Sequence, residues 1–384
     1  MRKNFIDHHL LEILKGFELA KEPPLDGFLS HYFRSHKALG SHDRRKICTK
    51  LYTLIRFRAL IDYFLEKPIT WEKRLLKLPT LDLKTLANDK TLPPHIRVSF
   101  PQVLFQLLQK DADPEDKNRG EKQALEICQI LNEEAPFTIR INPLKTSREQ
   151  FFNRLKVNYD VQKTNLSPLG IVFHKRINLF TLEEFKAGFF EVQDEGSQLV
   201  ANMVDVKPTD SVLDFCAGSG GKTLAFAPKM HGRGQIFLYD IRPAALRQAK
   251  KRLKRAGIQN GQIVLSYDKL KSLTKPFDWI LLDVPCSGSG TLRRNPDMKW
   301  KFALSDLEEL VAKQRNIFKA AFPLLKKGGY LLYATCSLFK KENEEQVKFF
   351  LDNYPLKQIE EPLKLLPISG GNDGFFACLF QKQD

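Results

Sequence analysis

From residue 196 onward the chain alternates short apolar runs, which are typical of β-strands, with segments at helical spacing. The predicted strands are 211–215, 235–240, 262–266, 278–283 and 329–334. The predicted helices between and around them are 196–204, 222–231, 243–256, 305–325 and 341–353. This alternation predicts an α/β fold with a doubly wound, Rossmann-like parallel sheet, which binds its ligands at the carboxyl ends of the strands. The last two segments, near 356–366 and 374–381, are predicted to form an antiparallel pair.

The chain before this region is predicted to form two further domains. Residues 1 to about 110 carry apolar side chains at three- and four-residue spacing, which predicts an all-α domain. The acid-rich stretch 111–120 is typical of a linker or an exposed turn, and we place the domain limits at 1–120, 121–195 and 196–384. The middle domain is predicted to be α+β: a helix at 121–133 precedes strands at 137–142 and 171–173, with helices packed on one face of the sheet.

A glycine-rich loop follows the first predicted strand. It reads DFCAGSGGKT over residues 214–223. A Walker loop would need glycine at Cys216, which argues against a nucleoside triphosphate, and the dinucleotide fingerprint fails at Thr223. Asp240 ends the next strand, where a carboxylate can accept both hydroxyls of a ribose, and Asp268 follows the third strand. Each acid taken alone could be a helix cap, but loop and acids together fit S-adenosylmethionine.

Two cysteines lie at the ends of later strands. Cys286 stands in DVPCSGSG, which begins at Asp283, and Cys336 stands in YATCS. The C5 position of a pyrimidine is not acidic, so its methylation needs a nucleophile at C6, and a thiolate adds and leaves readily. A second group must then remove the C5 proton. Two thiols at neighbouring strand ends could meet both demands, whereas a lone cysteine is usually a buried, inert thiol. That second interpretation applies to Cys48, Cys128 and Cys378.

The charge of the chain favours a polyanionic partner. Lys and Arg number 61 against 45 Asp and Glu, a formal charge of +16. The helix at 243–256 is predicted to expose cations on one face, and more cations follow the Cys286 loop; the predicted RNA-binding residues are Arg247, Lys251, Arg293, Arg294 and Lys299. The alternative for each group is a solvated surface. Because C6 is buried in a stacked helix, we expect a single-stranded or opened RNA target.

Other features limit the class of protein. No run approaches the ~20 apolar residues that span a bilayer, and the N-terminus does not resemble a signal peptide. The six cysteines contain no C-x-x-C pair, so neither a disulfide framework nor a metal site is predicted. A cytoplasmic protein with free thiols, and no membrane association, is the expectation.

The motifs resemble the Sun/Fmu family (RsmB/NOP-type) of RNA (cytosine-5) methyltransferases. Besides the loop at 214–223, the matching segments are DVPCSGSGT at 283–291, RNPDMKW at 294–300, GGYLLYATCS at 328–337, ENE at 342–344, QDEGS at 193–197 and DGFF at 373–376. The likeness covers about 137 to 381. It implies a class I methyltransferase domain, a small RNA-recognition-like subdomain over 121–195, and an all-α NusB-like domain over 1–120.

The resemblance also implies a role for each matching residue. Cys336 would attack C6 of cytosine and Cys286 would assist release of the adduct. Asp283 would lie at the junction of cofactor and base, where it could hydrogen-bond the cytosine ring. The implied cofactor residues are Cys216, Ala217, Gly218, Ser219, Gly220, Gly221, Lys222, Asp240, Asp268 and Asp283.

The chain departs from the family pattern in two places. Ala217-Gly218-Ser219 replaces A-A-P, a change that leaves binding through backbone amides intact. Ala245 stands where many members carry Arg, so one cofactor contact is either missing or supplied by Arg242.

The leading hypothesis is therefore a monomeric, S-adenosylmethionine-dependent enzyme that methylates a cytosine of 16S ribosomal RNA, free or in an early subunit particle. One alternative is a DNA cytosine methyltransferase, in which the Pro-Cys thiol would be the nucleophile. Another is a ribosome-assembly or RNA-binding factor that has kept the fold without the activity.

Overall fold

The computed structural model describes residues 5–19, 24–273 and 275–384. The chain forms two compact units. A helical unit comprises the residues up to 134 together with 291–302, and an α/β unit comprises 135–290 and 303–384. The parts of the predicted helical region at 1–4 and 20–23 lie outside the described residues. Within the described part of the chain, no helix combines the length and apolarity needed to cross a membrane.

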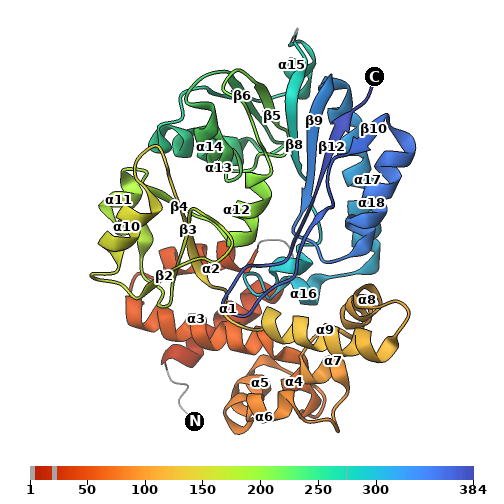
Figure 1. Ribbon diagram of the computed structural model, residues 1–384. Helices are drawn as coiled ribbons and strands as arrows, with labels where there is room; N and C mark the ends of the chain where they lie inside the picture. Colours follow the sequence, from red (N-terminus) through yellow and green to blue (C-terminus); the bar gives the residue numbers. More distant parts are fainter. Residues whose placement is uncertain (1–4, 20–23, 274) are drawn as a thin grey trace. The chain divides into compact units, whose positions relative to one another are not determined.

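The large sheet of the α/β unit has eight strands (Figure 1). They are β5 (Ser211–Asp214), β6 (Gln235–Tyr239), β7 (Gly261–Val264), β8 (Phe277–Asp283), β9 (Leu325–Thr335), β10 (Leu356–Gln358), β11 (Leu363–Leu365) and β12 (Phe375–Lys382). Strands β7, β6, β5, β8 and β9 are parallel neighbours in that order. Strand β12 runs antiparallel beside β9 and pairs with both β10 and β11. This is the predicted doubly wound sheet with an antiparallel edge.

Helices cover both faces of the sheet because successive strand residues point to opposite sides. Val212 and Leu281 belong to one apolar cluster, while Leu213 and Ile280 belong to the other. The first cluster includes side chains of α12 (Glu195–Asn202), α13 (Thr223–Phe226) and α14 (Pro243–Ala256). The second includes side chains of α15 (Tyr267–Lys271), α17 (Leu304–Ala321) and α18 (Glu344–Asn353). In Figure 1, α13 and α14 accordingly lie across the strands from α17 and α18.

The predicted elements differ from the observed ones mainly at prolines. The predicted helix 222–231 is the short α13 followed by a 3₁₀ turn at Ala227–Met230, which contains Pro228. Helix α17 ends at Ala321 rather than 325, because Pro323 cannot continue the hydrogen-bond ladder.

A second, four-stranded antiparallel sheet has the order β2-β3-β1-β4. Its strands are β1 (Phe137–Ile141), β2 (Val161–Lys163), β3 (Gly170–Phe173) and β4 (Phe190–Val192). Helix α10 (Arg148–Leu155) and helix α11 (Glu183–Lys186) pack into the apolar cluster on one face of this sheet, as predicted. The sequence analysis did not identify β2 and β4, which are only three residues long each.

The helical unit is all-α, as predicted. Its helices are α1 (Phe5–Leu19), α2 (Leu25–Ser35), α3 (Ser41–Arg56), α4 (Arg58–Tyr63), α5 (Trp71–Lys77), α6 (Leu83–Ala87), α7 (Pro94–Arg97), α8 (Gln102–Ala112), α9 (Lys117–Leu131) and α16 (Met298–Lys301). One apolar cluster joins α1, α2, α3 and α5, and Trp300 of α16 packs against it. A NusB-like fold for this unit remains a prediction.

The division near residue 120 differs from the prediction. Within the acid-rich stretch, residues 113–116 form a turn between α8 and α9 inside the helical unit, which is the second of the two predicted possibilities. Asp113 accepts hydrogen bonds from two following amides, and Asp116 caps α9. A Cβ at Gly120 would lie 2.5 Å from the carbonyl oxygen of Gln109, so glycine lets α9 pack closely on α8. Helix α9 thus belongs with the preceding helices.

Candidate active site

The glycine loop connects the carboxyl end of β5 to α13. Gly218 and Gly220 have φ angles of +53° and +78°, which favour glycine. The Gly218 amide donates to Asp240 Oδ2 at 2.8 Å, so the loop is fixed to the acid at the end of β6. Arg242 also pairs with Asp240, with Nε 2.9 Å from Oδ1 and an Nη 3.0 Å from Oδ2. Arg242 therefore lies at the carboxyl end of the sheet. This is the position that it needs in order to replace the arginine that many family members carry in place of Ala245.

Asp214 begins the loop and is almost fully buried. Thr223 Oγ1 donates to one of its carboxylate oxygens at 2.6 Å, while the other oxygen, Oδ1, has no hydrogen-bond partner. Burial raises the pKa of Asp214 to about 7. A buried polar atom without a partner is rare in proteins, and Asp214 is one of the residues that line a cavity.

The two thiols lie side by side. Cys286 Sγ is 3.3 Å from Cys336 Sγ, and the Cys336 amide is also 3.3 Å from Cys286 Sγ. The hydrogen bond to Cys336 and burial raise the pKa of Cys286 well above its usual value. A proton shared by the pair therefore resides on Cys286 when Cys336 is ionised.

Asp283 and Lys222 form an ion pair next to the thiols. Lys222 Nζ is 2.6 Å from Asp283 Oδ2, and its side chain is 9% exposed. Burial alone would lower the pKa of Lys222, but Asp283 outweighs it, so the net pKa is raised and the ammonium persists. That positive charge also interacts electrostatically with Cys336 and stabilises a thiolate there.

One cavity of about 600 Å³ joins the glycine loop to both thiols. Its lining includes Asp214, residues 215–219, Gly221, Lys222, Asp240, Arg242, Asp283, Cys286 and Cys336. Of the predicted cofactor residues, Gly220 and Asp268 do not line the cavity. The Asp268 carboxylate is 89% exposed and pairs with Lys271 at 2.8 Å, so its assignment to the cofactor stays a prediction from the sequence.

The predicted RNA-binding residues fall into two groups. Arg247 and Lys251 are exposed on α14, as predicted. Arg293 and Lys299 are buried, with exposed fractions of 0% and 1%, and Arg294 is half-buried. The expectation of an RNA-facing loop is therefore wrong for Arg293 and Lys299.

The buried ammonium of Lys299 is satisfied within the helical unit. Its Nζ donates to the carbonyl oxygen of Arg56 at 2.7 Å and to Asn132 Oδ1 at 2.8 Å, and it lies 4.3 Å from the ring centroid of Phe100. Charge alone marked Lys299 as a nucleic-acid contact, but its hydrogen bonds and its burial are typical of a structural role.

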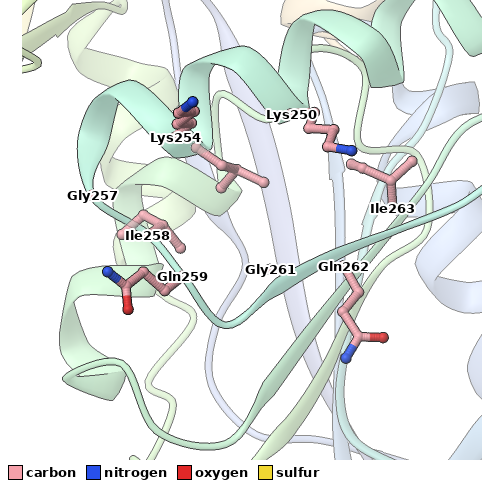
Figure 2. A pocket seen from close by; sticks show the side chains of 9 residues that line it. Lys250, Lys254, Gly257, Ile258, Gln259, Gly261, Gln262 and Ile263 are labelled. Atoms are coloured by element: carbon pink, nitrogen blue, oxygen red, sulfur yellow. The ribbon is translucent and has the colours of Figure 1, made fainter.

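Figure 2 shows a second hollow at the carboxyl-terminal end of α14, with a volume of about 520 Å³. Lys250 and Lys254 of the helix and Gln259 and Gln262 of the following segment line it, so it combines cations with amide groups. It is adjacent in sequence to Arg247 and Lys251 and extends the polar surface of α14.

Comparison with known proteins identifies the family. A family model for the 16S rRNA methyltransferase RsmB/F matches residues 201–381, and a model for the RsmF/B-like ferredoxin-like domain matches residues 116–179. A probable ribosomal RNA small subunit methyltransferase B of Synechocystis sp. is 32% identical over 320 residues, which cover 78% of this chain and 70% of the relative. The chain belongs to the RsmB/F methyltransferase family.

Other relatives agree with this assignment. The ribosomal RNA small subunit methyltransferase B of Proteus mirabilis is 34% identical over 66% of this chain and 60% of its own length. Among solved structures, PH0851 is similar with a TM-score of 0.81 and 22% identity, covering 97% of this chain and 98% of that one. The structure of NSun6 from Pyrococcus horikoshii with SFG is similar with a TM-score of 0.64 and 23% identity, and the match covers 74% of this chain and 99% of that one. These two structures show the shared fold.

S-adenosylmethionine is the cofactor of the RsmB/F family, in agreement with the prediction. The residues of the cavity fit it. The volume of the cavity is within the range of about 300–1,000 Å³ that is usual for ligand sites. Asp214 offers an unpartnered carboxylate oxygen, and Asp240 presents a second carboxylate at the strand end that commonly receives a ribose.

Several residues that hold the RsmB/F site together were not assigned a role from the sequence. Glu342 is fully buried, and its carboxylate accepts from the Ser287 amide at 2.9 Å, from Ser287 Oγ at 2.6 Å and from Gln314 at 2.9 Å. The neighbouring Asn343 accepts from Thr335 Oγ1 at 2.6 Å. The ENE segment thus supports the loops of both thiols, and its position within a family motif was the one signal for this role.

The small sheet contributes to the same support. Arg140 of β1 donates to the carbonyl oxygen of Gly221 at 3.1 Å and is bound by Gln193. Asn142 donates to the carbonyl oxygens of Gly188 and Ala256, both at 2.9 Å. Arg140 and Asn142 therefore position the glycine loop and the end of α14.

Proposed function

We propose that this protein transfers a methyl group to C5 of a cytosine in 16S ribosomal RNA through a covalent Cys336–C6 adduct. The observation that carries the proposal is the pair of thiols 3.3 Å apart in the cavity that also contains the cofactor loop. S-adenosylmethionine, when bound, supplies the methyl group. The substrate class is taken from the RsmB/F relatives, of which the chain matches 60–70% of the length in the two examples above.

Cys336 is the better nucleophile of the two. The pKa of Cys286 is raised by its hydrogen bond to Cys336 and by burial, which favours the protonated thiol there and leaves Cys336 as the nucleophile that the family resemblance implies. Lys222 stabilises a thiolate at Cys336. Addition of the thiolate sulfur to C6 forms an S–C bond and moves the ring electrons toward C5, which can then accept the methyl group.

Asp283 and Cys286 serve the remaining steps. Asp283 is only partly exposed and is oriented by Lys222, so it can hydrogen-bond the cytosine ring as charge develops on it. After methylation Cys286, once it has released its own proton to solvent, takes up the C5 proton; the C–H electron pair re-forms the C5–C6 double bond and the Cys336 sulfur departs as a thiolate. Cys286 lies beside that sulfur and assists its release.

RNA would approach across exposed cations of the α/β unit. Arg247, Lys250, Lys251 and Lys254 share the exposed face of α14, and two of them border the hollow in Figure 2. Phosphate contacts of this kind bind RNA without reading its sequence.

The test is methyl transfer from labelled S-adenosylmethionine to 16S ribosomal RNA, with an equal mass of double-stranded DNA as the competing substrate. We expect labelled 5-methylcytidine after digestion of the RNA, and none with Cys336→Ala. Label in DNA alone would favour the DNA methyltransferase alternative. No label in either, with cofactor binding intact, would favour an RNA-binding factor without activity.

A further inference from the structure

A cluster of metal-ligating side chains lies in the helical unit. His9 and Glu12 are three residues apart on α1, and His36 follows the end of α2. One ligand atom from each of the three lies within 4.8 Å of the others. Five of the eight histidines of the chain occur in its first 42 residues. His8 also lies beside Glu12, with Nε2 3.6 Å from Oε1, but His36 is the histidine that completes a group of three with His9 and Glu12 among the described residues.

The hydrogen bonds of His36 fix its tautomer. His36 Nδ1 is 2.9 Å from the carbonyl oxygen of Tyr32, which can only accept, so Nδ1 carries the proton. The lone pair of the ring is therefore on Nε2. A histidine that ligates a metal usually donates its other ring N–H to a carbonyl or carboxylate in this manner.

The hydrogen bonds of His9 fix its tautomer in a similar way. The Tyr32 hydroxyl donates its one proton to Glu12 Oε2 at 2.7 Å, so it must accept from His9 Nδ1, also at 2.7 Å. His9 consequently has its lone pair on Nε2.

The spacing of the rings suits a shared ion. The ring centroids of His9 and His36 are 5.5 Å apart, with an interplanar angle of 77°. Zinc–nitrogen bonds of about 2.0–2.1 Å place the ligand atoms of a tetrahedral ion about 3.3 Å apart, so a closure of the order of 1 Å completes the site. Glu12 Oε2 accepts from Tyr32, and the side chain is 47% exposed, so Oε1 is the oxygen that can turn toward an ion while this hydrogen bond is kept.

We propose that His9, Glu12 and His36 bind Zn²⁺ with three protein ligands and a water. Two imidazoles and one carboxylate are a ligand set that zinc prefers, whereas Mg²⁺ and Ca²⁺ prefer oxygen ligands alone. The ion would fasten the first half of α1 to the end of α2. The prediction of no metal site rested on the spacing of the cysteines alone, so it missed this group of two histidines and a glutamate.

The experiment is competition for Zn²⁺ between a colorimetric chelator and the untagged, metal-stripped protein. We expect one Zn²⁺ per chain, weaker binding by about tenfold or more in His36→Ala and in Glu12→Gln, and no protection by Mg²⁺. His31→Ala is the matched control, because His31 is an exposed residue of the same helix α2 outside the cluster.

A second readout separates binding from folding. Circular dichroism should report unchanged helicity in Glu12→Gln, while Zn²⁺ should raise the melting temperature of the wild-type protein and of His31→Ala but not of Glu12→Gln. Equal Zn²⁺ affinity in His31→Ala, His36→Ala and Glu12→Gln would overturn the proposal, as would the absence of stoichiometric binding by the wild-type protein.

Discussion

The Cys286 loop and the RNPDMKW segment are separated by only a few residues, but their buried polar groups do different work. Around Cys286, the carboxylate of Glu342 fixes the loop that carries this thiol in the α/β unit. In the RNPDMKW segment, Lys299 and Trp300 hydrogen-bond carbonyl oxygens of α3 within the helical unit. The difference shows that a dense family motif identifies the family without making each of its residues a contact for substrate.

The largest expected effect tests the structural side of this comparison. In Trp300→Ala we expect the free energy of unfolding to fall by about 3 kcal/mol, the usual cost of removing a packed Trp. Trp300 packs on the main apolar cluster of the helical unit, its Nε1 donates to Ile55 O at 2.7 Å, and Arg58 lies 5.5 Å from its ring centroid. Urea unfolding followed by far-ultraviolet circular dichroism measures the change.

Met298→Ala is the matched control for Trp300, because Met298 is 40% exposed in the same short helix. Its expected cost is within about 0.5 kcal/mol. If both variants kept wild-type stability and Trp300→Ala lost RNA affinity instead, the segment would be an RNA contact and the comparison would fail.

Glu342→Gln tests the catalytic side. We expect kcat for methyl transfer to fall by about 10- to 100-fold with KM nearly unchanged, because a small displacement of a reacting group is costly. Glu342 acts as a positioning residue through the Ser287 amide and hydroxyl. Steady-state kinetics measures the effect, and Glu345→Gln, an exposed glutamate in the same region, is the control. Equal kcat in the two variants would show that Glu342 does not position the Cys286 loop for catalysis.

The pH dependence of the free energy of unfolding tests whether Lys299 is buried in the helical unit. Burial lowers the pKa of Lys299 well below its usual value. At a pH between this folded-state pKa and the unfolded-state value of about 10.4, the unfolded chain binds the additional proton, so stability rises with pH. The slope is at most about 1.4 kcal/mol per pH unit. We expect Lys299→Met to flatten this part of the stability–pH curve, measured by urea unfolding. An unchanged curve would mean that the ammonium is not buried in solution.

The smallest expected effect concerns α14. Replacing Arg247 and Lys251 with Ala should reduce the dependence of RNA affinity on salt by about one unit of slope per cation and weaken binding equally for all sequences. Filter binding at several salt concentrations measures this. Lys327→Ala, which removes a side chain that is 74% exposed at the other end of the sheet, is the control. An equal change in Lys327→Ala would mean that RNA binding is governed by net charge and not by the α14 face.

Much of the α/β unit could be predicted because its signals are local. Helix α14 has the predicted bounds, since Pro243 begins it and Gly257, with a φ angle of +83°, ends it. The thiols and the glycine loop could be brought to one edge of the sheet from topology alone. Strand β4 and the contacts of Arg140 could not, because three residues carry too little pattern and a buried arginine depends on tertiary partners.

The helical unit shows where sequence patterns fail. The acids at 113 and 116 are typical of a linker or an exposed turn and suggested a domain limit near residue 120, but they cap a tight turn between packed helices. The positive charge of Lys299 suggested RNA, but its acceptors, Arg56 and Asn132, are more than 160 residues away in the chain. No local pattern reports such distant partners.

The most direct test of the central claim is covalent trapping. Wild-type protein, Cys286→Ala and Cys336→Ala are incubated with 16S ribosomal RNA and S-adenosylmethionine and separated on denaturing gels. We expect a stable protein–RNA adduct to accumulate in Cys286→Ala and to be absent from Cys336→Ala, because Cys336 forms the bond and Cys286 assists its release. An adduct that accumulates only in Cys336→Ala would reverse the two roles and contradict the proposed mechanism.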